Sequence, residues 1–347
     1  MKLLVLYEEL AGYFISSIEH FAQTTKMEVV IIHKSSNAVA PFKLETSQFI
    51  QLKNRDEISE QQLYDFVNSW VPNYIFCGGW IHKPYLKICK NAKGKVPIAL
   101  AFDNQWTGNL KQRLAVIYAQ FYFKKLFDKA FVPGTKQKQF AEKIGFKEKD
   151  IFTGVYCCDY NLFSSIYKDS LKSKQAHFPK VFLYTGRYSK EKGITDLWDA
   201  FVELEDHKSW ELWCVGIGAI PPINHPKIKH FGFIQPKDLG PIIEKSGVFI
   251  LPSHFEPWGV VVHEYAAAGF PILCSTKVGA SEVFLENTIN GFSFAPGNKS
   301  EIKNVLNKVI QMDETKLIEM SVKSHQISAK INNETWTASL KQLFGIK

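Results

Sequence analysis

Residues 248–275 read VFILPSHFEPWGVVVHEYAAAGFPILCS, and this stretch decides the predicted fold. The unbroken apolar run at 248–251 is typical of a strand in a parallel sheet that helices cover on both faces. A loop containing Glu256 follows it, and Gly259 begins a helical segment at 260–268 that stops before Pro271. The next apolar run, 272–274, completes a predicted strand–helix–strand unit.

The same alternation runs along the whole chain in two series. The predicted strands are residues 3–7, 28–32, 74–77, 98–102 and 129–132, then 180–185, 210–215, 229–231, 248–251 and 272–274. The predicted helices are residues 12–25, 60–70, 82–91, 109–127 and 137–144, then 195–204, 236–245, 260–268, 300–311, 314–331 and 333–343. Two such series predict an α/β protein with two doubly wound, Rossmann-like domains that face each other across a cleft.

One polar segment marks the expected boundary between these domains. Residues 164–178 are rich in Ser and Lys and show no clear periodicity, so we expect a linker there. The expected domains are then residues 1–165 and 178–330. Residues 331–347 carry apolar side chains at helical spacing, and this last helix can close either domain, including by crossing back to the first.

Composition narrows the class of protein. The chain has 347 residues, of which 46% are hydrophobic and 22% charged, as in folded soluble proteins. No stretch approaches the roughly 18–20 apolar residues of a membrane span. Six cysteines without a Cys-x-x-Cys pair argue against a zinc or thioredoxin-like site and favour a reducing compartment, which we take to be the cytoplasm.

A glycine-bounded basic loop follows the predicted strand at 180–185. Residues 186–193 read GRYSKEKG; Gly186 permits a tight turn, and Arg187 and Lys192 bracket a segment that leads into a helix. Two cations beside a helix N-terminus suit a diphosphate. From this segment alone, a solvated charged loop is an equally good interpretation.

Two glutamates flank the start of the helix at 260–268. Backbone amides of Trp258, Gly259, Val260 and Val261 would meet phosphate there, while Glu256 and Glu264 accept hydrogen bonds from sugar hydroxyls. Favourable interaction with the helix dipole explains a lone glutamate at Glu256 equally well, but it leaves the inward-facing Glu264 unexplained.

These segments together resemble the retaining glycosyltransferases of family 4, the group 1 family, which have the GT-B architecture. The shared features are the Gly-Arg-x-x-x-x-Lys-Gly loop at 186–193, the Pro-Ser-x-x-Glu end at 252–256 and the Glu256…Glu264 pair. The flanks at 230–234, 264–271, 279–283, 290–292 and 154–163 also resemble the family. The resemblance is strong over residues 150–300 and weak before them.

The resemblance implies a role for each matched residue. Arg187 and Lys192 would bind the donor diphosphate, and no metal or other cofactor would be needed. Glu264 would hold the ribose hydroxyls, and Phe233 would lie by the base. Glu256 would contact the transferred sugar and stabilise positive charge at its anomeric carbon.

The first domain departs from the family pattern. Its first loop, 8–13, has one glycine, Gly12, where the family usually has two. The region where many members carry a histidine reads LAFDNQW at 100–106, so Asp103 or Asn104 is the candidate for that polar role, with an Asx turn as the alternative. We expect His82 and His263 to be ordinary polar residues.

A basic segment in the first domain suggests a further partner. Residues 80–149 hold 15 Lys and Arg against 4 Asp and Glu, and 109–129 combine basic residues with aromatic and aliphatic ones. Such a helix can lie on an anionic membrane, although a core-packed helix with a basic edge is an equal alternative. No nucleic-acid-binding signature accompanies the basic patch.

The expected activity is transfer of a hexose from a nucleotide sugar, with UDP favoured, to a glycan or glycolipid, with retention and for cell-surface polysaccharide synthesis. The expected location is the cytoplasm or the inner face of the membrane. Two alternatives remain: a non-catalytic subunit that binds sugar nucleotides, and a sugar-nucleotide epimerase of the same fold.

Overall fold

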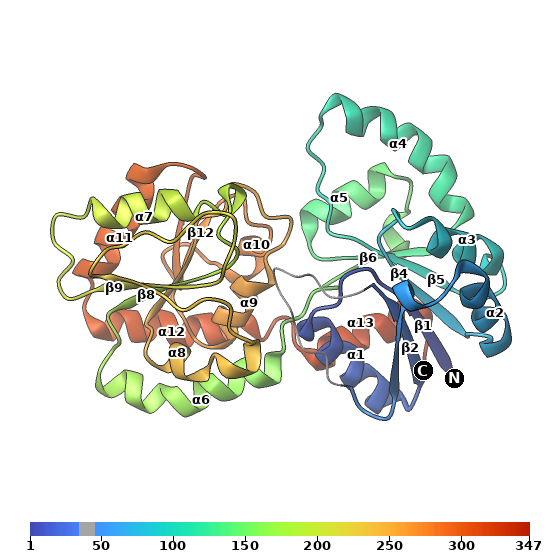
Figure 1. Cartoon of the computed structure of the whole chain (residues 1–347), viewed down its shortest axis with the longest axis horizontal. Coiled ribbons are helices and arrows are strands. Elements are labelled where there is room, and N and C mark those ends of the chain that lie inside the picture. Colours follow the sequence, from blue (N-terminus) through green and yellow to red (C-terminus); the bar gives the residue numbers. More distant parts are fainter. Residues whose placement is uncertain (35–45) are drawn as a thin grey trace. The chain divides into compact units, whose positions relative to one another are not determined.

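The computed structural model describes residues 1–34 and 46–347, which form two compact units (Figure 1). The first unit comprises Met1–Cys157 together with Asn333–Lys347, and the second comprises Cys158–Asn332. Each unit contains one parallel sheet flanked by helices. This arrangement confirms the predicted class of two Rossmann-like, doubly wound units, whereas the cleft between them stays a prediction.

The first unit has a seven-stranded sheet of order β3-β2-β1-β4-β5-β6-β7. Its strands are β1 (Lys2–Leu6), β2 (Glu28–His33), β3 (Ile50–Asn54), β4 (Tyr74–Gly78), β5 (Ile98–Ala101), β6 (Lys129–Val132) and β7 (Ile151–Thr153). Its helices are α1 (Gly12–Thr25), α2 (Glu60–Trp70), α3 (Lys83–Ala92), α4 (Leu110–Tyr122), α5 (Thr135–Lys143) and α13 (Asn333–Phe344), with short 3-10 turns η1 (Arg55–Glu57), η2 (Phe123–Lys125) and η3 (Glu148–Asp150).

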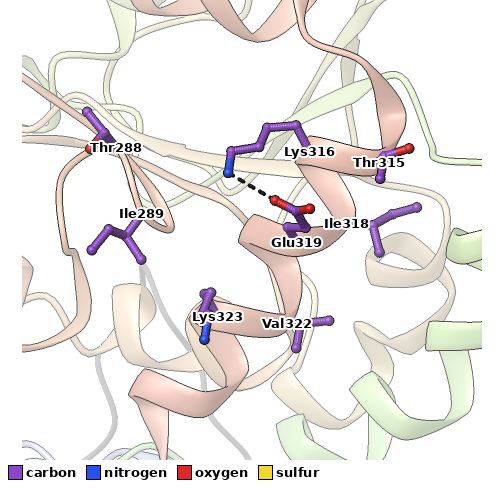
Figure 2. Close-up of a pocket in the computed structure, with 8 residues that line it drawn as sticks. All are labelled: Thr288, Ile289, Thr315, Lys316, Ile318, Glu319, Val322 and Lys323. Carbon is purple, nitrogen blue, oxygen red and sulfur yellow. Dashed lines mark hydrogen bonds and ion pairs between the residues drawn. The ribbon is translucent and has the colours of Figure 1, made fainter.

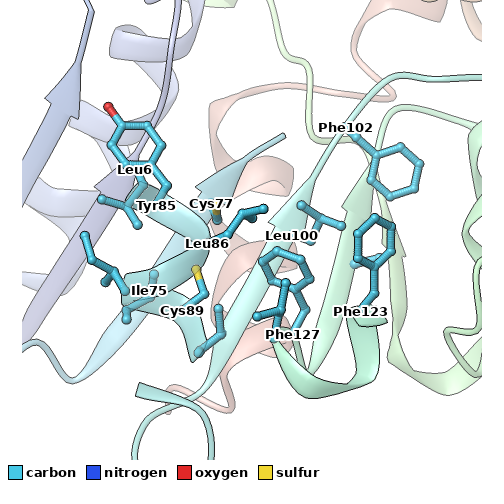
Figure 3. Packing of buried hydrophobic residues seen from close by; sticks show 14 of the residues in the cluster. Leu6, Ile75, Cys77, Tyr85, Leu86, Cys89, Leu100, Phe102, Phe123 and Phe127 are labelled. Carbon is cyan, nitrogen blue, oxygen red and sulfur yellow. The ribbon is translucent and has the colours of Figure 1, made fainter. Parts of the chain in front are cut away.

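The central strands of this sheet are buried on both faces, which explains their unbroken apolar sequence. On one face, strand side chains such as Ile75 and Leu100 pack with α3 and with Phe123 and Phe127 (Figure 3). On the other face, Phe76 and Phe131 meet aromatic side chains of α1 and α13.

The last helix, α13, belongs to the first unit although 175 residues of the second unit precede it in sequence. Trp336 is buried, packs edge-on against Phe14 and Phe21 of α1, and donates its indole N–H to the Val155 carbonyl at 2.8 Å. Asn333 donates to the Ser16 carbonyl at 3.2 Å. These contacts make α13 part of the first unit's core.

The second unit has a six-stranded sheet of order β10-β9-β8-β11-β12-β13. Its strands are β8 (Val181–Thr185), β9 (Glu211–Val215), β10 (Ile228–His230), β11 (Val248–Leu251), β12 (Ile272–Ser275) and β13 (Gly291–Phe294). Its helices are α6 (Tyr160–Ala176), α7 (Ile194–Val202), α8 (Gly240–Glu244), α9 (Val260–Ala267), α10 (Ser281–Phe284), α11 (Lys299–Gln311) and α12 (Glu314–Ser328), with 3-10 turns η4 (Lys190–Lys192) and η5 (Pro236–Asp238).

The predicted linker at 164–178 is wrong, because α6 occupies most of it. Asp159 caps this helix by accepting from the Leu162 amide at 3.3 Å. Its buried side includes Ser164, Ser170 and Lys174 beside Phe163 and Tyr167. Serines and a lysine therefore occupy buried positions where apolar residues are usual, so the helical period of apolar residues is not visible in the sequence.

Three strands were not predicted, namely β3, β7 and β13, and each lies at the edge of its sheet. An edge strand has a neighbour on one side only: β3 and β7 are partly exposed, and in β13 Gly291 and Ser293 alternate with two phenylalanines. They therefore lack the continuous apolar run that identifies a central strand.

Candidate active site

The order of the second sheet places two loops side by side. The strand order reverses at β8, whose neighbours are β9 and β11, and ligands of open α/β sheets bind where the order reverses, outside the carboxyl ends of the strands. The loop after β8 is GRYSKEKG, and the loop after β11 contains Glu256. Both predicted donor segments therefore leave the sheet at this point.

The backbone fixes Glu256 in front of α9. Its amide donates to the Lys277 carbonyl at 3.1 Å, and its carbonyl accepts from the Gly279 amide at 3.0 Å. Gly259 has φ of 90°, and a Cβ atom there would lie 2.9 Å from Cγ of Glu256. The turn that carries Glu256 into α9 therefore requires glycine at 259.

Glycine also permits the loop after β8 to pack on the loop after β11. Gly193 has φ of 65°, and a Cβ atom there would lie 2.3 Å from the Pro252 carbonyl oxygen. The His254 amide donates to the Glu191 carbonyl at 2.8 Å, and the His254 imidazole pairs with Asp196 of α7. The two loops form one tightly packed surface.

Within this surface, Lys192 Nζ and Glu256 Oε2 form an ion pair between residues 64 apart in sequence. Both side chains are 16% exposed, so water screens their charges only in part. Arg187 is exposed, and its side chain has no partner among residues 1–34 and 46–347. Lys192 is therefore paired with a carboxylate, whereas the Arg187 side chain has no partner in the described chain, and the sequence does not show this difference.

Glu264 lies on α9, next to Tyr265, whose hydroxyl is 2.6 Å from Thr185 Oγ1 at the end of β8. Glu264 as a residue is partly exposed, and its carboxylate has no hydrogen-bond or ion-pair partner in the described chain. Burial, and then the negative charge of Asp159, raises its pKa to about 7. A polar ligand that donates hydrogen bonds would satisfy this carboxylate.

The start of α9 offers unpaired amides. The first N–H groups of a helix have no partner within it, and Gly259 at the N-cap supplies no side chain. No hydrogen bond within the described residues uses the amides of Trp258, Gly259, Val260 or Val261. The Trp258 ring is buried and packs edge-on against Phe284, so only its backbone can reach a ligand.

The remaining predicted residues occupy loops in both units. Phe233 is partly exposed just beyond β10, and the neighbouring Gly232 carbonyl accepts from the Gly216 amide at 2.7 Å. Gly186 follows β8, and its amide donates to the Val215 carbonyl at 3.0 Å. These contacts bring together the loops after β8, β9 and β10.

In the first unit, Asp103 is partly exposed just after β5, and its carbonyl accepts from Gln137 at 3.2 Å. After burial, its negative charge is a further cause that raises the pKa of Tyr7 and of Tyr156. Gly12 begins α1, and a Cβ atom there would have nothing within 4 Å, so this position does not require glycine.

Of the two histidines expected to be ordinary polar residues, His263 has a structural role. His263 is fully buried, accepts from the Cys158 amide at 3.1 Å and lies 3.1 Å from the Ser328 carbonyl. Burial lowers its pKa to about 3, so it is neutral. His254 and Asp196 were not among the predicted site residues, and their only signal in the sequence is an acidic residue in the first turn of α7.

A surface groove of about 460 Å³ lies elsewhere on the second unit, over α12 (Figure 2). Its lining includes Ile289, Val322 and the Lys316–Glu319 ion pair, and none of the predicted donor residues. Within residues 1–34 and 46–347 there is no group of three or more His, Cys, Asp or Glu placed to hold a metal ion. The described helices are also too short or too polar to cross a membrane.

Known proteins resemble the second unit in sequence and the chain in fold. Residues 168–321 match the model of the family described as glycosyl transferases group 1. An uncharacterized glycosyltransferase of Methanocaldococcus jannaschii is 27% identical over 141 residues, or 38% of this chain and 36% of that protein. A glycogen synthase of Mycobacterium tuberculosis is 29% identical over 142 residues, or 38% of this chain and 34% of that protein. These matches span about a third of each relative.

One solved structure, Anabaena HepE in complex with UDP and glucose, covers 98% of this chain and 99% of its own. Its TM-score is 0.71 and its sequence identity 15%, so the likeness shows the fold alone.

Proposed function

We propose that this protein is a retaining, metal-independent glycosyltransferase, because residues 168–321 match the model of the glycosyl transferases group 1 family. It moves a hexose from a UDP-sugar to a glycan or lipid-linked acceptor in cell-surface polysaccharide synthesis, in the cytoplasm at the inner face of the membrane. The observation that carries this proposal is the Lys192–Glu256 ion pair, formed where the loops after β8 and β11 meet beside the start of α9.

The leaving diphosphate binds between Arg187, Lys192 and the free amides at the start of α9. Two cations and a helix N-terminus stabilise the negative charge that grows on the diphosphate as the sugar departs. Arg187 is free to take part because its side chain has no other partner in the described chain. The Anabaena structure, which contains UDP and glucose, supports the choice of a UDP-sugar as donor.

The two glutamates act on opposite parts of the donor. Glu256, held next to Lys192, lies beside the sugar and stabilises positive charge at the anomeric carbon as its bond to the diphosphate oxygen breaks. Glu264 accepts hydrogen bonds from the ribose hydroxyls, and Phe233 lies by the base. A carboxylate with no partner among the described residues suits that role, because the hydroxyls would supply the hydrogen bonds that it lacks.

Asp103 is our candidate for the polar group on the acceptor side. It follows β5 at the carboxyl edge of the first sheet, where open α/β sheets bind their ligands. It would orient the acceptor hydroxyl or accept its proton.

The deciding experiment compares Glu256→Gln with the wild type in an assay of UDP release from UDP-sugars, with and without glycan acceptors. We expect turnover to fall roughly 100-fold to 1000-fold, as when one transition-state contact is lost, with UDP affinity by calorimetry unchanged. Glu203→Gln is the matched control, because Glu203 is exposed at the end of α7.

The outcomes separate the three candidate activities. Full turnover in Glu256→Gln rejects the role of Glu256. A wild type that binds UDP-sugars but never releases UDP is a binding subunit, and one that returns an isomerised UDP-sugar is an epimerase.

A further inference from the structure

Helix α4 exposes a continuous apolar stripe. Leu110, Leu114, Ile117, Tyr118 and Phe121 are between 62% and 74% exposed, and their spacing places them along one side of the helix. The opposite side holds the helix to its unit: Ala119 is buried, and Val116 and Tyr122 pack against the core. Figure 1 shows α4 standing at the periphery of the first unit.

Such a concentration of exposed apolar side chains is found on no other helix of the described chain. The other large apolar side chains that are exposed in the described chain are scattered, as is normal for a protein surface. Five on one helix of 13 residues make one patch on the order of several hundred Å², and a patch of that size on a monomer is often functional. The stripe is therefore expected to be covered by a partner.

The charges around the stripe show which partner fits. Residues 104–127 contain Lys111, Arg113, Lys124 and Lys125 and no Asp or Glu. Lys124 and Lys125 lie in η2, directly after α4, and all four cationic residues are exposed. An apolar stripe bordered by cations alone complements a surface that is apolar inside and anionic outside.

We propose that α4 docks on an anionic lipid bilayer, parallel to its surface, with Leu114, Ile117 and Phe121 among the acyl chains and the cations at the headgroups. A helix of 13 residues is about 20 Å long, which suits a helix lying in the interface. A second copy of this chain would bring cations against cations, since neither stripe has a carboxylate at its border. A nucleic acid would leave the apolar side chains in water.

Docking of α4 on a membrane also indicates a class of acceptor, and this inference rests on the proposed function. Seven residues, 103–109, connect the end of β5 and Phe102 to α4, and Asp103 is the first of them. A docked α4 therefore holds the predicted acceptor edge of the first sheet close to the membrane. The acceptor class that this favours is a saccharide linked to a lipid.

Vesicle flotation tests the docking directly, with the full chain. We expect binding to phosphatidylcholine vesicles that contain phosphatidylglycerol, and at least about tenfold weaker binding to phosphatidylcholine alone or at high salt. Leu114→Gln/Phe121→Gln should lower binding about tenfold or more. The matched control is Val202→Gln/Ile289→Gln, which removes two exposed apolar side chains from the second unit and should bind as the wild type does.

A charge variant, Lys111→Gln/Lys124→Gln/Lys125→Gln, should weaken binding at least about tenfold on anionic vesicles and leave the weak binding to neutral ones unchanged. Equal binding of the wild type to both vesicle types overturns the proposal. So does an α4-dependent dimer in solution that does not float with vesicles. Thermal shift with UDP, measured on the same variants, reports the donor site separately, so loss of docking with a normal UDP shift leaves the proposed function intact.

Discussion

Replacing Gly259 with alanine tests whether the turn before α9 positions Glu256. Gly259 has φ of 90° and ψ of 67°, a conformation that residues with a Cβ atom rarely adopt. The added methyl group would lie 2.9 Å from Cγ of Glu256 and 3.1 Å from Cγ1 of Val278. One of these side chains must shift by a few tenths of an ångström.

The expected losses of stability and of turnover follow from the strained backbone at position 259 and from the close contact with Glu256. A non-glycine residue in a strained region of φ and ψ costs about 1–3 kcal/mol. For a unit of this size, 1 kcal/mol corresponds to about 3 °C, so the second unit should melt roughly 3–9 °C lower. Displacing the Glu256 side chain by a few tenths of an ångström should also reduce turnover by roughly threefold to tenfold, since a misplacement of about 1 Å can cost about 100-fold.

The assay is thermal unfolding followed by circular dichroism, together with UDP release from a UDP-sugar. Gly12→Ala is the matched control, because Gly12 has no neighbour within 4 Å of a Cβ atom and begins a helix. It should melt within about 1 °C of the wild type or slightly above it. Equal melting temperatures and equal turnover for Gly259→Ala and Gly12→Ala would refute the reasoning.

Two further predictions separate the charged groups of the site. Lys192→Ala and Arg187→Ala should each weaken UDP binding roughly 10-fold to 100-fold by calorimetry. Only Lys192→Ala should also lower the free energy of unfolding, by about 1–2 kcal/mol, because Lys192 holds Glu256 while Arg187 is exposed and unpaired in the described chain. Equal stability of the two variants would contradict this prediction. In the absence of donor, stability should fall as pH rises from about 4.5 to about 7, since the raised pKa of Glu264 makes the folded state hold a proton that the unfolded state releases. Glu264→Gln should remove that fall and be about 1–3 kcal/mol more stable than the wild type at pH 8 in urea unfolding, with no difference at pH 4; a parallel pH profile would reject the assignment.

The central strands and most helices were predictable because their signal is local. A strand such as Val248–Leu251 is apolar throughout since both faces are covered, and a helix such as Gly12–Thr25 repeats its apolar residues at helical spacing. The apolar periodicity is lost where polar or charged side chains occupy the buried positions of an element. Helix α6 hides its period behind serines and a lysine, and Lys174 lies buried with its ammonium 4.1 Å from the centre of the Phe270 ring.

The identity and order of the candidate site residues were also predictable from the sequence, and their roles stay predictions. The segments 186–193 and 252–264 name Arg187, Lys192, Glu256 and Glu264, and the need for glycine at 259 and 193 is a property of the backbone there. The sequence did not show which charged side chains form an ion pair. Lys192 pairs with Glu256 because neighbouring strands, far apart in sequence, end at one edge of the sheet, whereas the Arg187 side chain has no partner in the described chain.

The sequence by itself therefore determined the fold class and the candidate residues, since periodicity and turn chemistry act between residues that are close along the chain. Only the tertiary structure decided that α13 completes the first unit, that His254 pairs with Asp196, and that the apolar stripe of α4 is exposed while its other side is packed. Contacts between distant segments and the burial of one side of a helix depend on how sheets and helices pack, and no short stretch of sequence encodes that packing.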